Sequence, residues 1–204
     1  MLTKEIKLFR FDELSENAQE KAINRYKDEK DFYFCFAVNF KSIEYFAEQI
    51  LNSKIKKYSI HPYYHSYIEY DKSFLTDEIM DLKGLRAFKW IYNNIIDNCF
   101  NGKCFSTDGK YNYKFRYSKI IENLEDCIFT GACSDFYITD ILRDLLENKI
   151  DCGLTVEKLI KDIFDNWVKK TKEDMEYEDS EEFAKSVLDN GEEIYLENGK
   201  LFKY

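Results

Sequence analysis

The sequence predicts an α+β fold in which several amphipathic helices pack with a small antiparallel sheet in one compact domain. Apolar residues recur at intervals of three and four along several segments, which is typical of amphipathic helices. Shorter segments alternate apolar and polar residues, and hairpin-type turns connect them, which favours α+β over a doubly wound parallel sheet. A chain of 204 residues with 45% hydrophobic residues, one Pro and seven Gly fits a single domain over 1–204.

The first half of the chain opens with a strand and a helix. The segment 6–9 predicts a short strand, and Ser15 is expected to cap the helix that follows. Further helices are expected over 39–51 and 83–99, where apolar residues keep helical spacing. Between them, the Tyr-rich segment 57–71 contains both histidines and the proline, and it is expected to be strand-like.

The second half contains the strongest periodic patterns. Aromatic and polar residues alternate without a break over 111–117, as in a half-buried strand. Helices are expected over 136–147 and over 156–177, the second with near-ideal apolar spacing. Ser134 or Asp135 is expected to cap the first of these helices.

The section 172–204 predicts a helix followed by a hairpin. A short helix is expected after Ser180, ending at Asn190-Gly191 in a left-handed cap. The segment 194–202 places Asn198-Gly199 between apolar arms, which is a strong hairpin signal. The chain therefore closes with a β-hairpin.

Negative charge is concentrated in this same section. Residues 172–204 contain eleven Asp or Glu and four Lys, a net charge of −7 out of −9 for the whole chain. An acidic region of this kind indicates a basic partner, although it is also typical of a solvated helix end. The expected partner-binding carboxylates are Glu173, Asp174, Glu176, Glu178, Asp179, Glu181 and Glu182. Tyr177, Phe183 and Tyr195 would supply apolar anchors if they are exposed.

The strand region 110–119 supports an alternative function. Tyr111 and Tyr113 alternate with Lys114 and Arg116, as in surfaces that stack bases and track phosphates. Strict alternation also suits a strand with one buried face, and the isoelectric point of about 4.9 disfavours direct nucleic-acid binding. Nucleic-acid or nucleotide binding is therefore the alternative prediction.

Other candidate chemistries lack a complete pattern. His61 and His65 with Cys99 and Cys104 could form a zinc site, but paired ligands of the C-x2-C type are missing, so we predict no metal. Cys133 lacks a recognisable base. We predict no enzymatic activity, no catalytic residues and no cofactor.

Two further patterns have simpler interpretations. Gly131 with Ser134 and Asp135 could form an anion-binding turn, but a phosphate loop needs more glycines and a lysine. Adjacent carboxylates such as Glu192-Glu193 point about 100° apart on a helix, so they suit a solvated surface better than general acid–base catalysis.

Location is predicted from two absences. The longest apolar run, 32–38, falls far below the roughly 20 residues that span a bilayer. The N-terminal segment 1–11 offers no secretory pattern, so we expect no membrane association and six reduced cysteines in the cytoplasm of a bacterial host.

Several segments together resemble a group of uncharacterised bacteriophage and prophage proteins that are loosely described as antitoxin-like. The segments that carry the resemblance are 11–19, 58–60, 82–86, 127–135 and 165–177. Ala132 departs from this group, which usually has an aromatic residue after the glycine of the Thr-Gly turn. The resemblance implies a phage accessory protein acting inside a bacterial cell.

The predicted function is that of a phage-type accessory protein that binds and inhibits or neutralises a host protein. Its acidic surface would occupy a basic surface that otherwise receives nucleic acid. An antitoxin or an inhibitor of restriction or CRISPR defence would fit this description.

Overall fold

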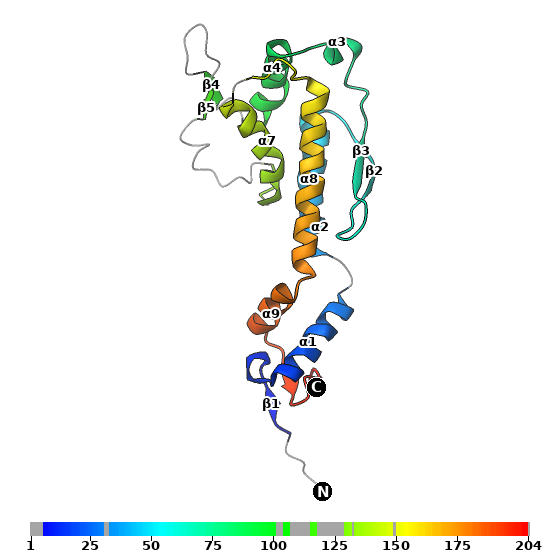
Figure 1. Ribbon diagram of the computed structural model, residues 1–204, viewed down its shortest axis with the longest axis vertical. Coiled ribbons are helices and arrows are strands. Elements are labelled where there is room, and N and C mark those ends of the chain that lie inside the picture. Colours follow the sequence, from blue (N-terminus) through cyan, green and yellow to red (C-terminus); the bar gives the residue numbers. More distant parts are fainter. Residues whose placement is uncertain are drawn as a thin grey trace. The chain divides into compact units, whose positions relative to one another are not determined.

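The computed structural model describes residues 6–30, 33–100, 104–106, 115–117, 129–131, 133–148 and 150–203. It confirms the α+β class, because helices dominate and the described strands form antiparallel pairs (Figure 1). The chain divides into two compact units. Unit 1 comprises Met1–Phe34 and Asp174–Tyr204, and unit 2 comprises Cys35–Glu173. The prediction of one domain over 1–204 stays a prediction, but the acidic C-terminal section belongs to a unit that also contains the N-terminus.

Unit 1 combines two short helices with a two-stranded sheet formed by the two ends of the chain. Its elements are β1 (Leu8–Phe9), η1 (Phe11–Glu13), α1 (Glu16–Glu29), α9 (Glu181–Asn190) and β6 (Tyr195–Leu196). Strand β1 pairs antiparallel with β6, with Leu8 opposite Leu196 and Phe9 opposite Tyr195. The core of the unit consists of Phe11, Leu14, Ala18, Ala22, Ile23, Ala184, Leu188 and Tyr195.

The predicted C-terminal hairpin is confirmed, and its turn is held against α1. The amide of Leu196 donates to the carbonyl of Lys200 at 2.8 Å. Gly199 has a φ of +82°, and a Cβ at this position would lie 2.2 Å from the carbonyl oxygen of Ala18. Two features therefore require glycine at position 199: its backbone conformation and its close approach to α1.

Unit 2 is built around two long helices. Helix α2 (Phe34–Tyr45) continues into a π-helical turn, η2 (Phe46–Ile50), and α8 spans Val156–Glu178. The remaining elements are β2 (Ile55–Ser59), β3 (Tyr67–Tyr70), α3 (Asp77–Met80), α4 (Leu85–Ile91), the π-helical η3 (Tyr92–Ile96), α5 (Asp97–Phe100), β4 (Cys104–Ser106), β5 (Phe115–Tyr117), η4 (Cys133–Asp135) and α7 (Phe136–Glu147).

The core of unit 2 is aromatic where α8 meets the β2–β3 hairpin. Trp167 is fully buried, and its indole nitrogen donates to the carbonyl of Asn39 at 3.0 Å. The ring of Tyr70 stacks on that of Phe164, with 4.1 Å between centroids and 9° between planes. These contacts attach α2 and β3 to the same helix.

Several predicted elements need correction. The helix expected over 39–51 begins at Phe34, and Asn39 is a buried residue inside it whose carbonyl accepts the indole N–H of Trp167 from α8. Gly191 has a φ of −76°, so α9 ends in an extended residue and not in the predicted left-handed cap. Ser15 precedes α1, but its carbonyl and not its hydroxyl accepts the first helical amides.

Other elements agree with the sequence patterns. Helix α7 covers 136–147 and α8 extends one residue beyond the predicted 156–177. The region 57–71 forms the antiparallel β2–β3 hairpin, with Tyr58 opposite Ile68. Of the predicted strand 111–117, Phe115–Tyr117 forms β5, and the remainder lies outside the described residues.

Candidate partner-binding surface

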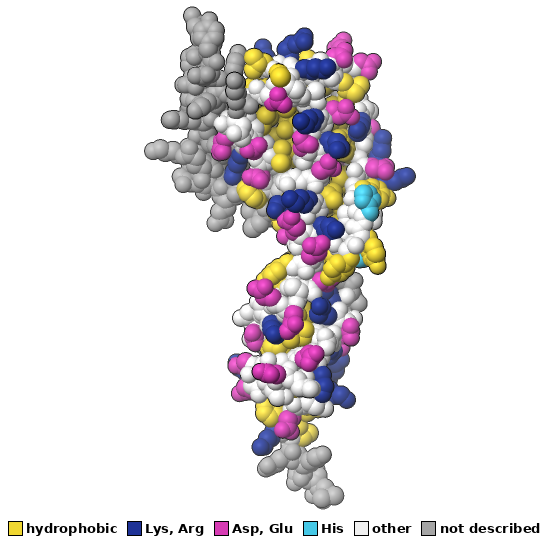
Figure 2. Space-filling model, viewed as in Figure 1, with side chains coloured by type: hydrophobic (Ala, Val, Ile, Leu, Met, Phe, Trp, Pro, Cys, Tyr) yellow, Lys and Arg dark blue, Asp and Glu magenta, His cyan; other side chains and the backbone are white. Residues whose placement is uncertain are grey.

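Most of the negative charge of the chain lies in one of the two units. Unit 1 contains eighteen acidic and ten basic residues, a net charge of −8 in 65 residues. Unit 2 has twenty-one acidic and twenty basic residues, a net charge of −1. The face of unit 1 in Figure 2 shows many carboxylates among fewer basic side chains. Almost all of this charge comes from 174–204, which contains ten acidic and three basic residues, whereas 1–34 is nearly neutral.

Two of the predicted partner-binding carboxylates have a structural role. Glu178 is 7% exposed, and its carboxylate lies 3.4 Å from the Lys30 ammonium group. Asp179 lies 3.4 Å from the same ammonium group and accepts a hydrogen bond of 2.5 Å from the Tyr33 hydroxyl. The Lys30 nitrogen also lies 4.2 Å from the centre of the Tyr33 ring. We call Lys30, Tyr33, Glu178 and Asp179 the Lys30 cluster.

The Lys30 cluster has an electrostatic effect on α1. Burial and then the negative charge of Glu178 raise the pKa of Tyr26 above its usual value. Buried carboxylates need a partner, because an unpaired charge in a low-dielectric environment is costly. Through Lys30, Glu178 and Asp179 thus connect the N-terminal and C-terminal parts of unit 1.

The start of α9 presents two more of the predicted carboxylates. The Ser180 hydroxyl accepts the Phe183 amide at 3.0 Å, which confirms that Ser180 caps this helix. Glu181 and Glu182 occupy the first turn, where negative charge complements the helix dipole. Glu181 forms an exposed ion pair with Lys185 at 2.7 Å, and this contact lowers the pKa of Glu181. Both side chains remain accessible to a partner.

The remaining predicted carboxylates lie on α8. Glu173 belongs to unit 2 and pairs with Lys170 at 2.8 Å. Asp174 is half-buried and Glu176 is exposed, and both belong to unit 1. The seven residues thus comprise a buried pair, exposed helix-start residues and α8 residues assigned to different units.

Sequence reasoning missed an ion pair between half-buried Arg25 and exposed Glu193. The Arg25 guanidinium group lies 3.0 Å from the Glu193 carboxylate, which also accepts the Tyr195 hydroxyl at 2.5 Å. Burial and then the hydrogen bond to Glu193 raise the pKa of Tyr195 well above its usual range. Residues 25 and 193 are far apart in sequence, so no local pattern could have identified this contact.

Unit 1 also exposes carboxylates that make no ion pair within the described part of the chain. On α1 and just before it these are Asp12, Glu16, Glu20 and Asp28, and on α9 and after it they are Glu182, Asp189, Glu192 and Glu197. Sequence reasoning considered the second group in part and missed the first. A count of charge over 1–34 could not have shown it, because seven basic residues there balance all but one of the eight acidic residues.

The proposed aromatic anchors differ in accessibility. Tyr177 is 50% exposed, and its ring packs edge to face on Phe183 with centroids 5.5 Å apart. Tyr195 is fully buried in the core of unit 1 and cannot contact a partner. Tyr177 is therefore the accessible member of the predicted set, with half-buried Phe183 behind it.

Hydrogen bonds from buried side chains stabilise the Thr130-Gly131 turn and the start of α7. Asp135 is fully buried and accepts the amides of Phe129 and Thr130, each at 2.8 Å, and the Thr130 hydroxyl at 2.9 Å. Its side chain makes no capping bond to α7, and Ser134 instead contacts the Ser42 hydroxyl at 2.7 Å. The predicted cap is wrong because both side chains stabilise this turn. The chain's own carboxylate already occupies amides that an anion would need.

The other predicted chemistries find no assembled site in the part of the chain that is described. There, no group of three or more His, Cys, Asp or Glu could hold a metal ion. His61 accepts the Tyr63 amide through Nδ1 at 3.2 Å in the β2–β3 turn, and Cys99 is buried on α5. Cys152 is an exposed free thiol.

For the strand region 110–119 of the alternative nucleic-acid hypothesis, the structure describes only the backbone of 115–117. Tyr111, Tyr113 and Lys114 lie outside the described residues. Arg116 lies in β5, opposite Phe105 of β4. This hypothesis stays a prediction.

Comparison with protein-family models, curated proteins and solved structures gives no match. The resemblance to phage proteins therefore stays a prediction as well. Within the described segments, none of the helices has both the length and the apolar character needed to cross a membrane.

Proposed function

We propose that the protein is a non-enzymatic binding protein whose acidic unit 1 occupies a basic surface of a partner protein. The partner would be a nucleic-acid-handling protein of a bacterial cell, inhibited because carboxylates occupy the sites of phosphates. An antitoxin-like or anti-defence role in a phage would be one form of this activity. The observation that carries the proposal is the net charge of −8 within 65 residues.

Two properties of unit 1 support this function. Buried Glu178 pairs with Lys30, and Glu193 pairs with Arg25, so the exposed acidic residues stand on an ordered scaffold. Clustered exposed charges of one sign accelerate association with an oppositely charged surface and discriminate against other partners. Tyr177 adds an exposed aromatic ring of the type that is enriched at binding hot spots.

Charge reversal in each unit tests the proposal with a matched control. The unit 1 variant carries Glu20→Lys, Glu182→Lys and Asp189→Lys. The control in unit 2 carries Asp97→Lys, Asp140→Lys and Asp162→Lys, which are also exposed and make the same change in net charge. Each variant is immobilised and exposed to nuclease-treated bacterial extract, and retained proteins are identified by mass spectrometry.

We expect a basic protein to bind the wild-type chain and the unit 2 control, with affinity for the unit 1 variant reduced about 10-fold or more. The wild-type chain should also displace nucleic acid from this partner, and the affinity should fall with salt because exposed charges are screened. Equal retention by all three chains would contradict the proposal. Recovery of nucleic acid before nuclease treatment would instead favour the strand 110–119.

A further inference from the structure

Among the described residues, strand β2 of unit 2 has a backbone partner on one edge only. Strands β2 and β3 form a two-stranded sheet in which Ile55 lies opposite Tyr70 and Ser59 opposite Tyr67. Within the described residues, no backbone hydrogen bond reaches 55–59 from the side away from β3. Such an edge presents backbone donors and acceptors that can pair with another extended chain.

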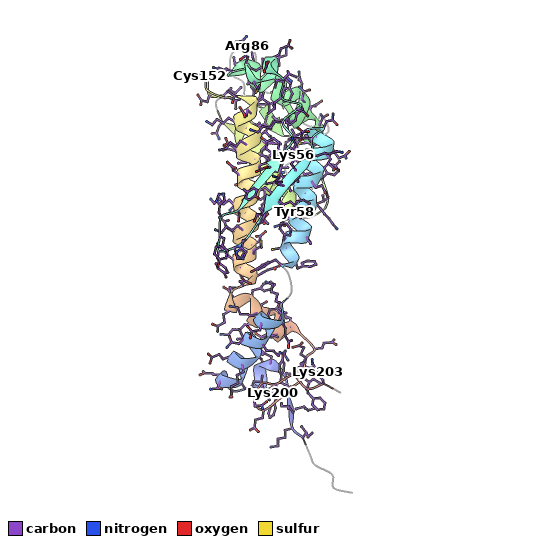
Figure 3. The ribbon with its side chains drawn as sticks, turned by 90° about the vertical axis from the view of Figure 1, so that its right-hand side faces the viewer. Lys56, Tyr58, Arg86, Cys152, Lys200 and Lys203 are labelled. Carbon is purple, nitrogen blue, oxygen red and sulfur yellow. The ribbon has the colours of Figure 1, made fainter. Side chains whose placement is uncertain are left out.

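Helix α2 packs against β2, and a groove lies between them. Figure 3 shows the strands against α2 and α8, with Lys56 and Tyr58 of β2 labelled. The Tyr58 ring lies 4.6 Å from that of Phe40, which fixes β2 against α2. A groove of about 600 Å³ runs between β2 and the side chains of Phe40, Glu44 and Glu48. Its volume is within the range of ligand-binding clefts.

On the helix side of the groove, two glutamates four residues apart, Glu44 and Glu48, lie on one helix face. Glu44 belongs to α2 and Glu48 to η2, and both are exposed. Neither forms an ion pair with a described residue, although lysines lie on the β2 side of the groove. Of these, Lys56 pairs with Asp71 at 3.1 Å, and Lys57 lies opposite Glu69 in the β2–β3 register. Basic charge on β2 is therefore partly compensated within the hairpin, whereas Glu44, Glu48 and Lys54, which precedes β2, form no ion pair with a described residue.

We infer that this groove binds an extended peptide of a partner protein, which pairs with the β2 edge and directs Lys or Arg side chains toward Glu44 and Glu48. Side chains alternate between the two faces of a strand, so the basic residues would stand at every second position of the peptide. The five residues of β2 span about 17 Å, enough for about five peptide residues. The exposed ring of Tyr58, which faces α2, would contact the aliphatic parts of these side chains.

The chemistry of the groove favours a peptide over a nucleic acid. Single-stranded nucleic acid would place phosphates near Glu44 and Glu48 and would leave the backbone groups of β2 unused. A peptide strand satisfies both features. The inference concerns unit 2 and is independent of the function proposed for unit 1.

Selection from a random octapeptide library displayed on phage tests the inference with the full chain. The test variant carries Glu44→Lys and Glu48→Lys. The matched control carries Asp140→Lys and Asp162→Lys, which make the same change in net charge outside the groove. Selected peptides are resynthesised with a fluorescent label, and their dissociation constants are measured by anisotropy. A labelled 16-nucleotide oligo-dT is measured in parallel against wild type and Lys54→Ala with Lys57→Ala.

We expect enriched peptides with Lys or Arg at alternate positions that bind the wild-type chain and the Asp140/Asp162 variant alike. Their binding to the Glu44/Glu48 variant should weaken at least 10-fold, and a proline in the middle of the peptide should abolish it. Binding should slow hydrogen exchange of the Ile55–Ser59 amides. Failure to enrich peptides, or equal binding by the Glu44/Glu48 variant, would overturn the inference. Oligo-dT binding that depends on Lys54 and Lys57 would overturn it in favour of nucleic acid.

Discussion

Replacing Lys30 by methionine tests whether the Lys30 cluster stabilises unit 1. The side chains of Lys30 and Glu178 are 13% and 8% exposed, and 3.4 Å separates their charged groups. Removing one partner of a buried ion pair leaves an uncompensated charge and costs about 3–5 kcal/mol. Asp179 is 20% exposed and keeps its hydrogen bond from Tyr33, so we expect the lower end, about 3 kcal/mol.

The assay must report on unit 1 separately, because both tryptophans, Trp90 and Trp167, belong to unit 2. Hydrogen exchange of the slowest amides of α1 and α9 measures the free energy of opening in unit 1. A loss of about 3 kcal/mol corresponds to exchange that is roughly 100-fold faster. Tryptophan fluorescence during urea unfolding gives the parallel reading for unit 2.

A second substitution distinguishes charge burial from lost packing. Adding Glu178→Met to Lys30→Met removes the uncompensated charge and should restore much of the lost stability, since buried ion pairs can be replaced by apolar residues. Lys185→Met, which breaks the exposed pair with Glu181, is the control and should leave exchange unchanged. Unchanged exchange in Lys30→Met, or no recovery in the double variant, would refute this account of the cluster.

Three further outcomes follow from the structure. Gly199→Ala should destabilise unit 1 by more than 2 kcal/mol, whereas Gly131→Ala, with a similar φ of +79° but open space, should cost only about 1 kcal/mol in denaturant unfolding. Asp135→Asn should cost about 2–3 kcal/mol by Trp fluorescence, because it weakens three hydrogen bonds to a buried carboxylate. Burial, followed by the charges of Glu157 and Asp165, raises the pKa of Tyr70 to about 12. The unfolded chain loses this proton first, near pH 10, so stability should fall as pH rises from about 10 to about 12, and less so in Tyr70→Phe.

Local patterns predicted much of the fold. Helices α7 and α8 and the C-terminal hairpin follow from periodicity and turn chemistry, which act between residues close in sequence. The π-helical turns η2 and η3 were missed, since nothing in helical spacing distinguishes them from α-helix. The start of α2 was also missed, because the role of Asn39 depends on Trp167 from α8.

The sequence predicted the negative charge of the candidate site but not the arrangement of its residues. Acidic excess after residue 172 is visible in the sequence, and so is the exposure expected of Glu181 and Glu182 at a helix start. The burial of Glu178 against Lys30 is not visible, because it joins residues about 150 positions apart. The carboxylates of α1 join the acidic unit through contacts between remote segments, including the pairing of β1 with β6, the packing of α1 on α9 and the Arg25–Glu193 ion pair.

The sequence by itself determined the α+β class, the main helices, the closing hairpin and the acidic bias, because each depends on spacing or composition within a short segment. The tertiary structure decided which carboxylates pair with Lys30 and Arg25 and which make no ion pair in the described part of the chain. It also decided that no described strand pairs with the second edge of β2. These features depend on distances between segments remote in sequence, which local propensity does not encode.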